Sequence, residues 1–543
     1  MLTPEYLKHV PDRMAALYEE LETDILIDMA RKIAKANYWM PATEWQHYIL
    51  QQMGATEQEI LLRLSSMTGK SQNELKRLMR EAGIATVKSE ARRAKASAEI
   101  ASEGLGQILN DGYRATNKAF ANLTKTTARG GAQQLIDELD KAYLKIRSGA
   151  FSYDVATVQA IKALADGGVK VSYGGGRTET LEVAVRRAVM TGVNQTGIRL
   201  NADIADQLNA PLMETTAHAG ARPSHEVWQG KRFGRNGAVR IDGVLYEDFT
   251  TATGYGTGPG VGGWNCRHSA HAAWPWESPT YSKELLQSYQ DKSIEYNGRH
   301  YTQYEASQIQ RYQERKIRKW KREFAMLDAA GQDTTTAAVK VKHWQAGRSD
   351  FLKQTGLKVQ GVRERVAGYE QNQSRKAGKE ARSYYRNWSK SLGVNDAIKT
   401  LAKYYDIKYN DSPTYTLLQH YVRDVKAGWI SPNADFGNYR NQYELVQNEV
   451  VGIKTPNGIL IKRQSVHFLQ RVLGTATDPG HEYRTRSGVS IEDIKEALQH
   501  PTLIGPCKTS KSGKRSIKFV GKNCEVSVNP DDGTLIQTNP RKR

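Results

Sequence analysis

A dense group of glycines between residues 254 and 263 constrains the fold of this chain more than any other stretch. Six of these ten residues are glycine, so the backbone turns sharply there, in conformations where a side chain would clash. Histidines, tryptophans and a cysteine surround the turns, within the segment from His218 to Trp276. Chemically specialised residues on a loop, after a helix-rich start, indicate a functional site or a docking surface.

The same segment carries donors for a metal ion, since zinc takes nitrogen and sulfur ligands in a tetrahedron. The donors are His218, His225, Cys266, His268 and His271. Their spacing follows no standard pair such as C-x-x-C, and only one cysteine is present. The sequence therefore favours a structural site with no metal or other cofactor.

In that metal-free interpretation the histidines bond the backbone or one another. A small core under the loop is then expected from Trp228, Trp264, Trp274 and Trp276. Nucleophilic catalysis by Cys266 with His268 is disfavoured, because residues two apart need not converge and no orienting group is evident.

Length and charge bound the organisation of the chain. At 543 residues it exceeds the roughly 250–300 residues of a single core, which predicts two or three domains. A net charge of +20 favours anionic partners and serves solubility equally well. Three scattered cysteines fit a reducing cytoplasm. No apolar run approaches the roughly 20 residues of a membrane span, and the first residues lack a signal-peptide core, so we expect no membrane contact.

Residues 1–150 are predicted to be helical. Apolar residues recur at helical spacing from Met14 to Ile25. Three capping boxes follow, and they predict short helices over 42–54, 56–67 and 71–82. The boxes pair Thr43 with Gln46, Thr56 with Glu59, and Ser71 with Glu74. An alanine-rich stretch from Lys88 to about Thr127 predicts a long, partly exposed helix.

Residues 151–280 are predicted to form a mixed α+β domain. Strands are expected over 169–173 and 212–217, on either side of a helix from Glu179 to about Leu208. The sequence G-G-G-R-T beginning at Gly174 matches neither a P-loop nor G-x-G-x-x-G, so a plain tight turn is expected there and not a phosphate cradle.

Residues 281–370 are predicted to form a basic helical region, with a helix from Tyr281 to about Ala330. Its cations are Arg311, Arg315, Lys316, Arg318, Lys319, Lys321 and Arg322. Aromatic residues interleaved with them indicate a surface for nucleic acid, and an acidic protein neighbour or plain solvation is the alternative. Helical character resumes over 337–370. Residues 371–411 are polar and are predicted to be a partly helical linker.

Two motifs within 218–276 resemble the phage minor capsid protein 2 family, a relative of the head-morphogenesis proteins typified by protein F of phage Mu. The first is H-x-G-A-R-P-S-H-x-x-W-Q-G-K-x-F from His218, and the second is G-W-N-C-R-H-S-x-x-A-A-W-P from Gly263. We assign a structural role in this motif to His218, Arg222, His225, Trp228, Trp264, Asn265, Cys266, Arg267 and His268.

The resemblance runs from about residue 1 to about residue 370. It implies a low-copy structural protein of a tailed-phage head, assembled in the cytoplasm of a bacterial host and lying in the head interior beside the portal. The partners that it implies are the portal and the major capsid or scaffold proteins, with packaged DNA as a further partner.

Residues 412–543 are predicted to be a separate small α+β domain. Ser465 caps a helix over 466–473, and Ser490 with Asp493 begins a second helix that ends at His500. Strands are expected over 458–461, 516–520, 523–529 and 534–538, the last two joined by a Pro-Asp-Asp-Gly turn.

This domain also carries the parts for cutting RNA without a metal. His467 and Arg471 share a helix face, and Lys518 lies on a strand. One such group moves the 2′-hydroxyl proton, and cations stabilise the charged phosphorane. A basic run expected to bind nucleic acid consists of Lys508, Lys511, Lys514, Arg515 and Lys522. A structural histidine and a solvated lysine loop are the alternative.

Four segments of this domain resemble the phage-borne branch of the barnase–EndoU–colicin–RelE nuclease fold, over about Ile459 to Thr538. They are S-V-H-F-L-Q-R, H-P-T-L-I-G, R-S-I-K-F-V and E-V-S-V-N-P-D-D-G-T-L-I-Q-T. By this resemblance His467 is the general acid or base, Arg471 and Lys518 bind phosphate, and Thr538 hydrogen-bonds it. His481 is a second acid/base candidate, but no motif fixes a second histidine, so the pair stays unassigned.

The resemblance implies a metal-independent endoribonuclease that acts as an effector or toxin on host RNA. Two alternatives stay open. In one, the protein is purely structural and its C-terminal domain is inactive, docking on a capsid partner or on nucleic acid. In the other, the domain is a DNA-binding module that serves packaging.

Overall fold

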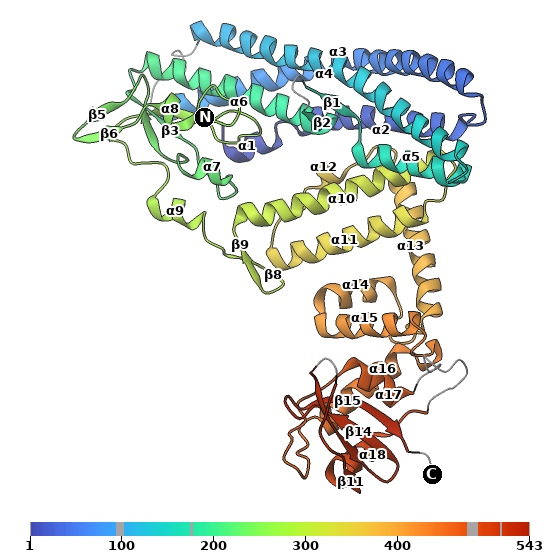
Figure 1. The fold of residues 1–543 in the computed structure, drawn as a ribbon. Helices are drawn as coiled ribbons and strands as arrows, with labels where there is room; N and C mark the ends of the chain where they lie inside the picture. The colour runs from blue at the N-terminus through green and yellow to red at the C-terminus, as the bar shows by residue number, and fades with distance from the viewer. Residues whose placement is uncertain (1, 94–101, 174–176, 475–486, 511–512, 542–543) are drawn as a thin grey trace. The chain divides into compact units, whose positions relative to one another are not determined.

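The computed structural model describes residues 2–93, 102–173, 177–474, 487–510 and 513–541. The chain divides into two compact units, residues 1–378 and 379–543, and the division falls within helix α13 (Gln371–Ser391). Most elements are helices, with small sheets in both units (Figure 1). This confirms the mainly helical expectation in its coarse form.

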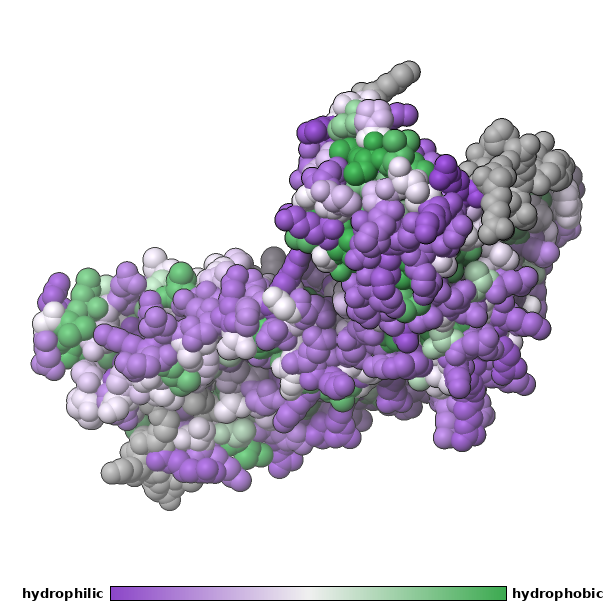
Figure 2. All heavy atoms as spheres, turned by 90° about the horizontal axis from the view of Figure 1, so that it is seen from below, coloured by the Kyte–Doolittle hydropathy of each residue, from purple (hydrophilic) through white to green (hydrophobic). Residues whose placement is uncertain are grey.

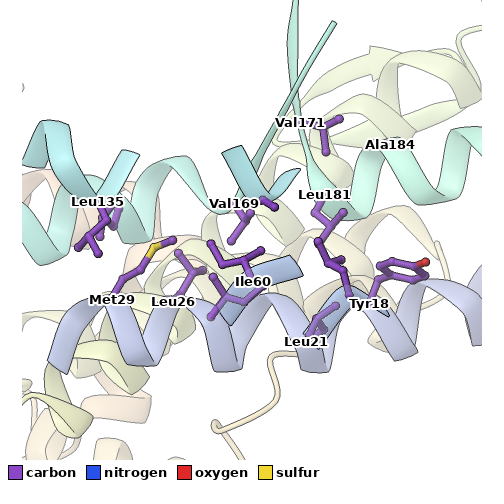
Figure 3. Close-up of a cluster of buried hydrophobic side chains, with 14 of the residues drawn as sticks. Tyr18, Leu21, Leu26, Met29, Ile60, Leu135, Val169, Val171, Leu181 and Ala184 are labelled. Atoms are coloured by element: carbon purple, nitrogen blue, oxygen red, sulfur yellow. The ribbon is translucent and has the colours of Figure 1, made fainter. Parts of the chain in front are cut away.

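Unit 1 contains a layer of long helices. Its first helices are α1 (Pro4–His9), α2 (Asp12–Lys35), α3 (Ala42–Arg93), α4 (Ser102–Arg147), α5 (Tyr153–Gly167) and α6 (Leu181–Gln207). A two-stranded antiparallel ribbon, β1 (Lys170–Ser172) with β2 (Thr178–Thr180), precedes α6. The main core is buried between α2, α3, α4, α5 and α6. Figure 3 shows Leu26 and Met29 of α2 directed toward Ile60 of α3, with Leu135 of α4 beside them.

The three short helices predicted over 42–82 are one continuous helix, α3. The supposed capping hydroxyls have other roles. Thr56 is buried and accepts a hydrogen bond from Lys32 Nζ of α2 at 2.8 Å, and Ser71 Oγ donates to the Thr68 carbonyl within its own helix at 2.9 Å. Packing against α4 and α6 keeps the helix intact where local signals predicted breaks. The stretch from Lys88 to about Thr127, predicted as one alanine-rich helix, contains the end of α3 and the first part of α4, two helices that pack against each other. Residues 94–101 lie outside the described part.

A three-stranded antiparallel sheet lies beside α6 and carries the His218–Trp276 segment. Its order is β4-β3-β7, from β4 (Arg232–Gly234), β3 (Leu212–Thr215) and β7 (Ala270–Ala273). Short elements join these strands: α7 (Pro223–Glu226), the ribbon β5 (Val239–Ile241) with β6 (Val244–Tyr246), and α8 (Phe249–Thr253). Strands β3 and β7 are fully buried, so they hold the loops around them in place.

The helix predicted from Tyr281 to Ala330 is interrupted. The structure has α9 (Lys283–Ser288), a ribbon of β8 (Ile294–Tyr296) with β9 (Arg299–Tyr301), and then α10 (Gln303–Ala329). Asn297 and Gly298 both have positive φ, 51° and 71°, as a tight hairpin turn requires. Thr302 and Glu305 form the capping box that begins α10. Two helices complete unit 1, α11 (Thr335–Thr355) and α12 (Gly361–Glu364).

Unit 2 contains two hydrophobic clusters. Helices α14 (Leu401–Asn410), α15 (Ser412–Lys426) and α16 (Phe436–Leu445) pack with the end of α13 around Tyr421 and Tyr439. Residues 371–411, expected as a partly helical connector, thus form α13 and α14 and supply part of this core. The short helices η2 (Pro432–Ala434) and η3 (Val446–Val450) lie before and after α16.

The second cluster of unit 2 is an α+β core. Helices α17 (Val466–Leu473) and α18 (Ile491–Gln499) pack on a sheet of order β10-β15-β14-β13-β11. The strands are β10 (Arg463–Gln464), β11 (Leu503–Ile504), β12 (Lys508–Thr509), β13 (Arg515–Val520), β14 (Cys524–Val528) and β15 (Thr534–Pro540). All pairs are antiparallel except β10 with β15. The two predicted helices and the β13–β15 meander are confirmed, but the strand expected over 458–461 is only an isolated bridge at Leu460.

Hydrophilic residues cover most of the face in Figure 2, with hydrophobic ones in small separate areas. Within the described residues, no helix combines the length and the apolar character needed to cross a membrane.

Candidate functional site

The two motifs of the His218–Trp276 segment fold onto each other beside α6. Asn194 of α6 is fully buried, and its Nδ2 donates to the carbonyls of Cys266 at 3.1 Å and His268 at 2.8 Å. Thr216 accepts a hydrogen bond from the Ser269 amide at 2.9 Å. The second motif is therefore fixed from both sides, by the helix and by the strand that leads into the first motif.

The glycines bring the loop close to its own backbone. The Trp264 amide donates to the Gly258 carbonyl at 2.7 Å, and a Cβ at Gly258 would lie 2.6 Å from the Trp264 ring. Gly262 has a φ of 70°, which favours glycine. Glycine is therefore required at both Gly258 and Gly262.

Three ligand-type atoms meet at the centre of the segment, here called the HCH cluster: His225 Nδ1, Cys266 Sγ and His268 Nδ1. The two nitrogens are 3.3 Å apart, and the sulfur is 3.7 Å from His225 Nδ1 and 3.6 Å from His268 Nδ1. The three side chains are buried, with exposed fractions of 1–2%. No other group of three or more histidine, cysteine or acidic residues in the described part of the chain converges closely enough to hold a metal ion.

Each histidine of the cluster is oriented through its other ring nitrogen. His225 Nε2 lies 2.8 Å from the Pro259 carbonyl, and His268 Nε2 lies 3.1 Å from Gln229 Oε1. The Trp228 ring packs against both imidazoles, with centroids 4.5 and 4.8 Å away. An orienting group for His268 is therefore present, although none was evident from the sequence.

Burial keeps the cluster neutral. It lowers the pKa of His225 to about 4 and that of His268 well below its ordinary range. Burial also raises the pKa of the Cys266 thiol, and backbone hydrogen bonds from His268 and Gly262 lower that pKa only in part. A buried neutral thiol is a poor nucleophile, so the closeness of Cys266 and His268 does not by itself make a catalytic pair.

His218 and His271 lie outside the HCH cluster. The His218 ring stacks on His268 with centroids 4.5 Å apart, and its Nδ1 lies 3.3 Å from Arg267 Nη2. Burial and Arg267 lower the pKa of His218 to about 2. His271 is fully buried on β7, with Nδ1 3.0 Å from the Ala272 carbonyl.

The expected tryptophan core is wrong for two of its four members. Trp228 is buried and Trp274 partly buried in the cluster under the loop, but Trp264 is 45% and Trp276 79% exposed. Arg222 donates to the Trp264 carbonyl at 2.6 Å, and Arg177 lies over the Trp264 ring at 5.1 Å. Trp264 is thus held in a fixed orientation at the surface.

A cationic cleft of about 600 Å³ lies between α6, α10 and the motif. Its basic lining residues are Lys8, Arg186, Arg267, Arg311, Arg315, Lys316, Arg318, Lys319, Arg322 and Arg363, and its acidic ones are Asp166, Glu182 and Glu314. Asn265 lines it too. Burial, Arg363 and Arg267 together lower the pKa of Arg311 to about 10. Within the described residues neither Arg311 nor Arg363 has a carboxylate at ion-pair distance, which leaves both guanidinium groups available to an anion.

Two cations of α10 have a different role from the one expected. Arg318 and Arg322 are almost fully buried and pair with Glu22 of α2 at 3.3 Å each, and Arg318 also pairs with Glu182. Glu22 accepts a further hydrogen bond from the Val169 amide at 3.0 Å. The nucleic-acid surface predicted from the basic helix therefore does not include these two arginines, which neutralise carboxylates inside unit 1.

In unit 2, His467 and Arg471 lie on α17, as the sequence predicted. His467 Nδ1 is 3.2 Å from Gln470 Oε1, and its ring meets Trp429 edge-on at 6.5 Å. Arg471 Nε and Nη1 are buried with no hydrogen-bond partner among the described residues. His481 lies outside the described residues.

The other two predicted catalytic residues lie on opposite faces of the sheet. Phe519 faces the core against α17 and α18, so its neighbour Lys518 faces away and pairs with Glu525 at 2.9 Å. Thr538 opposes Val526 on the core side, is fully buried, and donates to the Glu525 carbonyl at 3.1 Å. The structure therefore does not gather the four residues in one open site.

The predicted basic run is spread over the β12–β13 ribbon and the turn after β13. Lys508, Lys514 and Lys522 are exposed, while Arg515 pairs with Asp531 at 2.7 Å. Lys511 is not among the described residues.

Three residues that matter here were not assigned a role from the sequence: Gln229, Asn194 and Glu22. Gln229 stands within the first motif, and this position could have identified it as part of the site. Asn194 and Glu22 gave none, because their importance comes from contacts across 72 to 300 residues of chain.

Comparisons with known proteins give one match. A sequence model of the phage minor capsid protein 2 family, described as "Phage minor capsid protein 2", matches residues 2–353. No curated protein and no solved structure matches the chain. The matched region covers the long-helix layer, the HCH cluster and the lining of the cationic cleft except Arg363. It amounts to more than half of the 543 residues. The chain belongs to the phage minor capsid protein 2 family.

Proposed function

We propose that this protein is a portal-associated component of the head of a tailed bacteriophage, lying in the head interior beside the portal and the major capsid or scaffold proteins. The observation that carries the proposal is the family match, which lies within unit 1 and includes both motifs. The rigid, surface-presented Trp264 ring is the part of the motif best suited to contact a neighbour, because tryptophan supplies much apolar area at little entropic cost.

The test is incorporation into heads. Heads are assembled with wild-type chain or with the Trp264→Ala variant, purified, and analysed by quantitative mass spectrometry for this chain. We expect the wild type to be present and the variant depleted. Trp276→Ala removes a more exposed tryptophan ring of the same segment and is the control. Absence of the wild-type chain from purified heads refutes the proposal, and equal incorporation of Trp264→Ala refutes the role given to Trp264.

Packaged DNA is proposed as a further partner of unit 1. Phosphate contacts favour arginines without carboxylate partners, and the cationic cleft offers Arg311 and Arg363 in that state. Arg318 and Arg322 are not part of this contact, because they already pair with Glu22.

For unit 2 we propose metal-independent ribonuclease activity on host RNA, in the role of an effector. It is supported by Arg471, whose buried Nε and Nη1 have no partner among the described residues, one helical turn from His467. An arginine in that state is suited to a phosphate group. Lys518 and Thr538, on opposite faces of the sheet, are not included in this form of the proposal.

RNA cleavage by the full chain in EDTA tests it, beside His467→Ala and the exposed control His500→Ala. Cleavage by the wild type and the control, but not by His467→Ala, supports the proposal. Cleavage by all three removes His467 from the mechanism. No cleavage of total host RNA by the folded chain favours the alternative, a purely structural head protein with an inactive C-terminal unit.

A further inference from the structure

The spacing of the HCH cluster fits a metal ion. Zinc binds imidazole nitrogen at roughly 2.0–2.1 Å and thiolate sulfur at roughly 2.3 Å. In a tetrahedron these bond lengths place neighbouring ligand atoms roughly 3.3–3.6 Å apart. The separations between His225 Nδ1, Cys266 Sγ and His268 Nδ1 are 3.3, 3.6 and 3.7 Å. One point in space therefore lies at bonding distance from all three atoms.

The hydrogen bonds behind the cluster fix the tautomers that a metal requires. A carbonyl oxygen only accepts, so His225 Nε2, beside the Pro259 carbonyl, carries the proton. Gln229 Oε1 accepts from the His218 amide at 3.1 Å, which establishes its oxygen there, so His268 Nε2 carries a proton too. Both Nδ1 atoms then present lone pairs to the centre. Such outer contacts are typical of metal-binding histidines.

Without a cation this arrangement is unfavourable. Two lone pairs would face each other at 3.3 Å inside a buried pocket. The single thiol proton of Cys266, which also has the His268 carbonyl within 3.7 Å, can satisfy at most one of them. A cation at the centre, with Cys266 as thiolate, satisfies all three donors at once.

We propose that His225, Cys266 and His268 bind a zinc ion, with a fourth position for water or another oxygen. Two imidazoles and one thiolate form a zinc-type donor set. The ion joins α7 to the glycine-rich loop and to the start of β7, so it has a structural role in the fold of both motifs. This proposal replaces the metal-free interpretation favoured by the spacing of residues in the sequence.

The first test uses the full chain, expressed in zinc-supplemented medium and purified without chelators. Elemental analysis is expected to give about one zinc per chain. After removal of zinc, cobalt(II) titration is expected to produce a thiolate-to-cobalt charge-transfer band with tetrahedral d–d bands. These two measurements do not depend on whether any variant folds. A zinc-free wild type that also gives no charge-transfer band overturns the proposal.

Variants then locate the ion. Cys266→Ser and His268→Ala are expected to lose the zinc and the charge-transfer band. The matched controls, Cys524→Ser at a buried cysteine of unit 2 and His300→Ala at an exposed histidine, are expected to keep both. Gln229→Leu is expected to weaken zinc binding by roughly 10–100-fold, as loss of a group that orients a ligand does. Zinc retained in full by Cys266→Ser overturns the proposal.

Discussion

Replacing Glu22 by glutamine should destabilise unit 1 more than any comparable surface change. The Glu22 side chain is 2% exposed and faces Arg318 and Arg322, both 9% exposed, at 3.3 Å. Glutamine keeps the shape but removes the charge, so Arg322 is left buried without a carboxylate. Breaking a buried pair in this way costs roughly 3–5 kcal/mol. At roughly 2.1 cal/mol/K of unfolding entropy per residue, a unit of 378 residues loses about 5 °C of Tm.

Differential scanning calorimetry of the full chain measures this loss, and the transition of unit 2 serves as an internal reference. Glu20→Gln, an exposed carboxylate on the same helix, is the control and should stay within roughly 0.5 kcal/mol of the wild type. Adding Arg322→Met to Glu22→Gln should recover part of the loss, because it removes the unpaired cation. If Glu22→Gln is as neutral as Glu20→Gln, the buried network does not stabilise the unit and the reasoning is wrong.

Three further predictions follow from other sites. Burial raises the pKa of Glu19, Glu314 and Glu323 to about 7, so between pH of about 4.5 and about 7 the folded state holds protons that the unfolded chain has lost, and the free energy of unfolding should fall as pH rises through this range. The pH dependence of Tm should therefore become flatter when all three residues are replaced by glutamine, but not in the control Glu20→Gln. Arg311→Gln and Arg363→Gln should each reduce the steepness with which the binding constant for duplex DNA falls with salt, by roughly 0.9 in the log–log slope per lost phosphate contact, whereas Arg299→Gln, at an exposed arginine, should not. An unchanged slope in both cleft variants would exclude the cleft as the DNA contact. Phe468→Ala removes a fully buried side chain and should lower the free energy of unfolding of unit 2, measured in urea, by roughly 3–5 kcal/mol. Leu503→Ala changes a side chain that is 62% exposed and should have little effect, so equal effects of the two variants would contradict the packing of α17.

Elements governed by local signals were predictable from the sequence. Helix α17 begins at Val466 after the Ser465 cap, as predicted, because the serine accepts the Phe468 amide. The β13–β15 meander follows the alternation of its residues and a Gly533 turn. The same local signals failed at Thr56 and Ser71, because tertiary packing of α3 buries both and gives their hydroxyls other partners.

Features that depend on distant residues could not be predicted. The spacing of His225 and Cys266, 41 residues apart, matches no metal motif, and their meeting requires the β3–β7 pairing and the glycine turns. The sequence predicts a nucleic-acid surface along the basic helix, with an acidic neighbour or solvation as the alternative, but no local pattern indicates that Arg318 and Arg322 pair with Glu22. On β13, strand alternation did predict that Lys518 lies opposite Phe519, but not which face α17 covers.

The pairing of Glu22 with Arg318 also has a consequence for synthesis on the ribosome. The two residues are separated by 296 positions, and at translation rates of roughly 5–20 residues per second their emergence is separated by roughly 15–60 s. During that interval α2 exists without the arginines that neutralise its carboxylate. The first helices therefore complete their packing only after α10 has emerged, and a chain truncated before Arg318 would present an unsatisfied acidic group to chaperones and proteases.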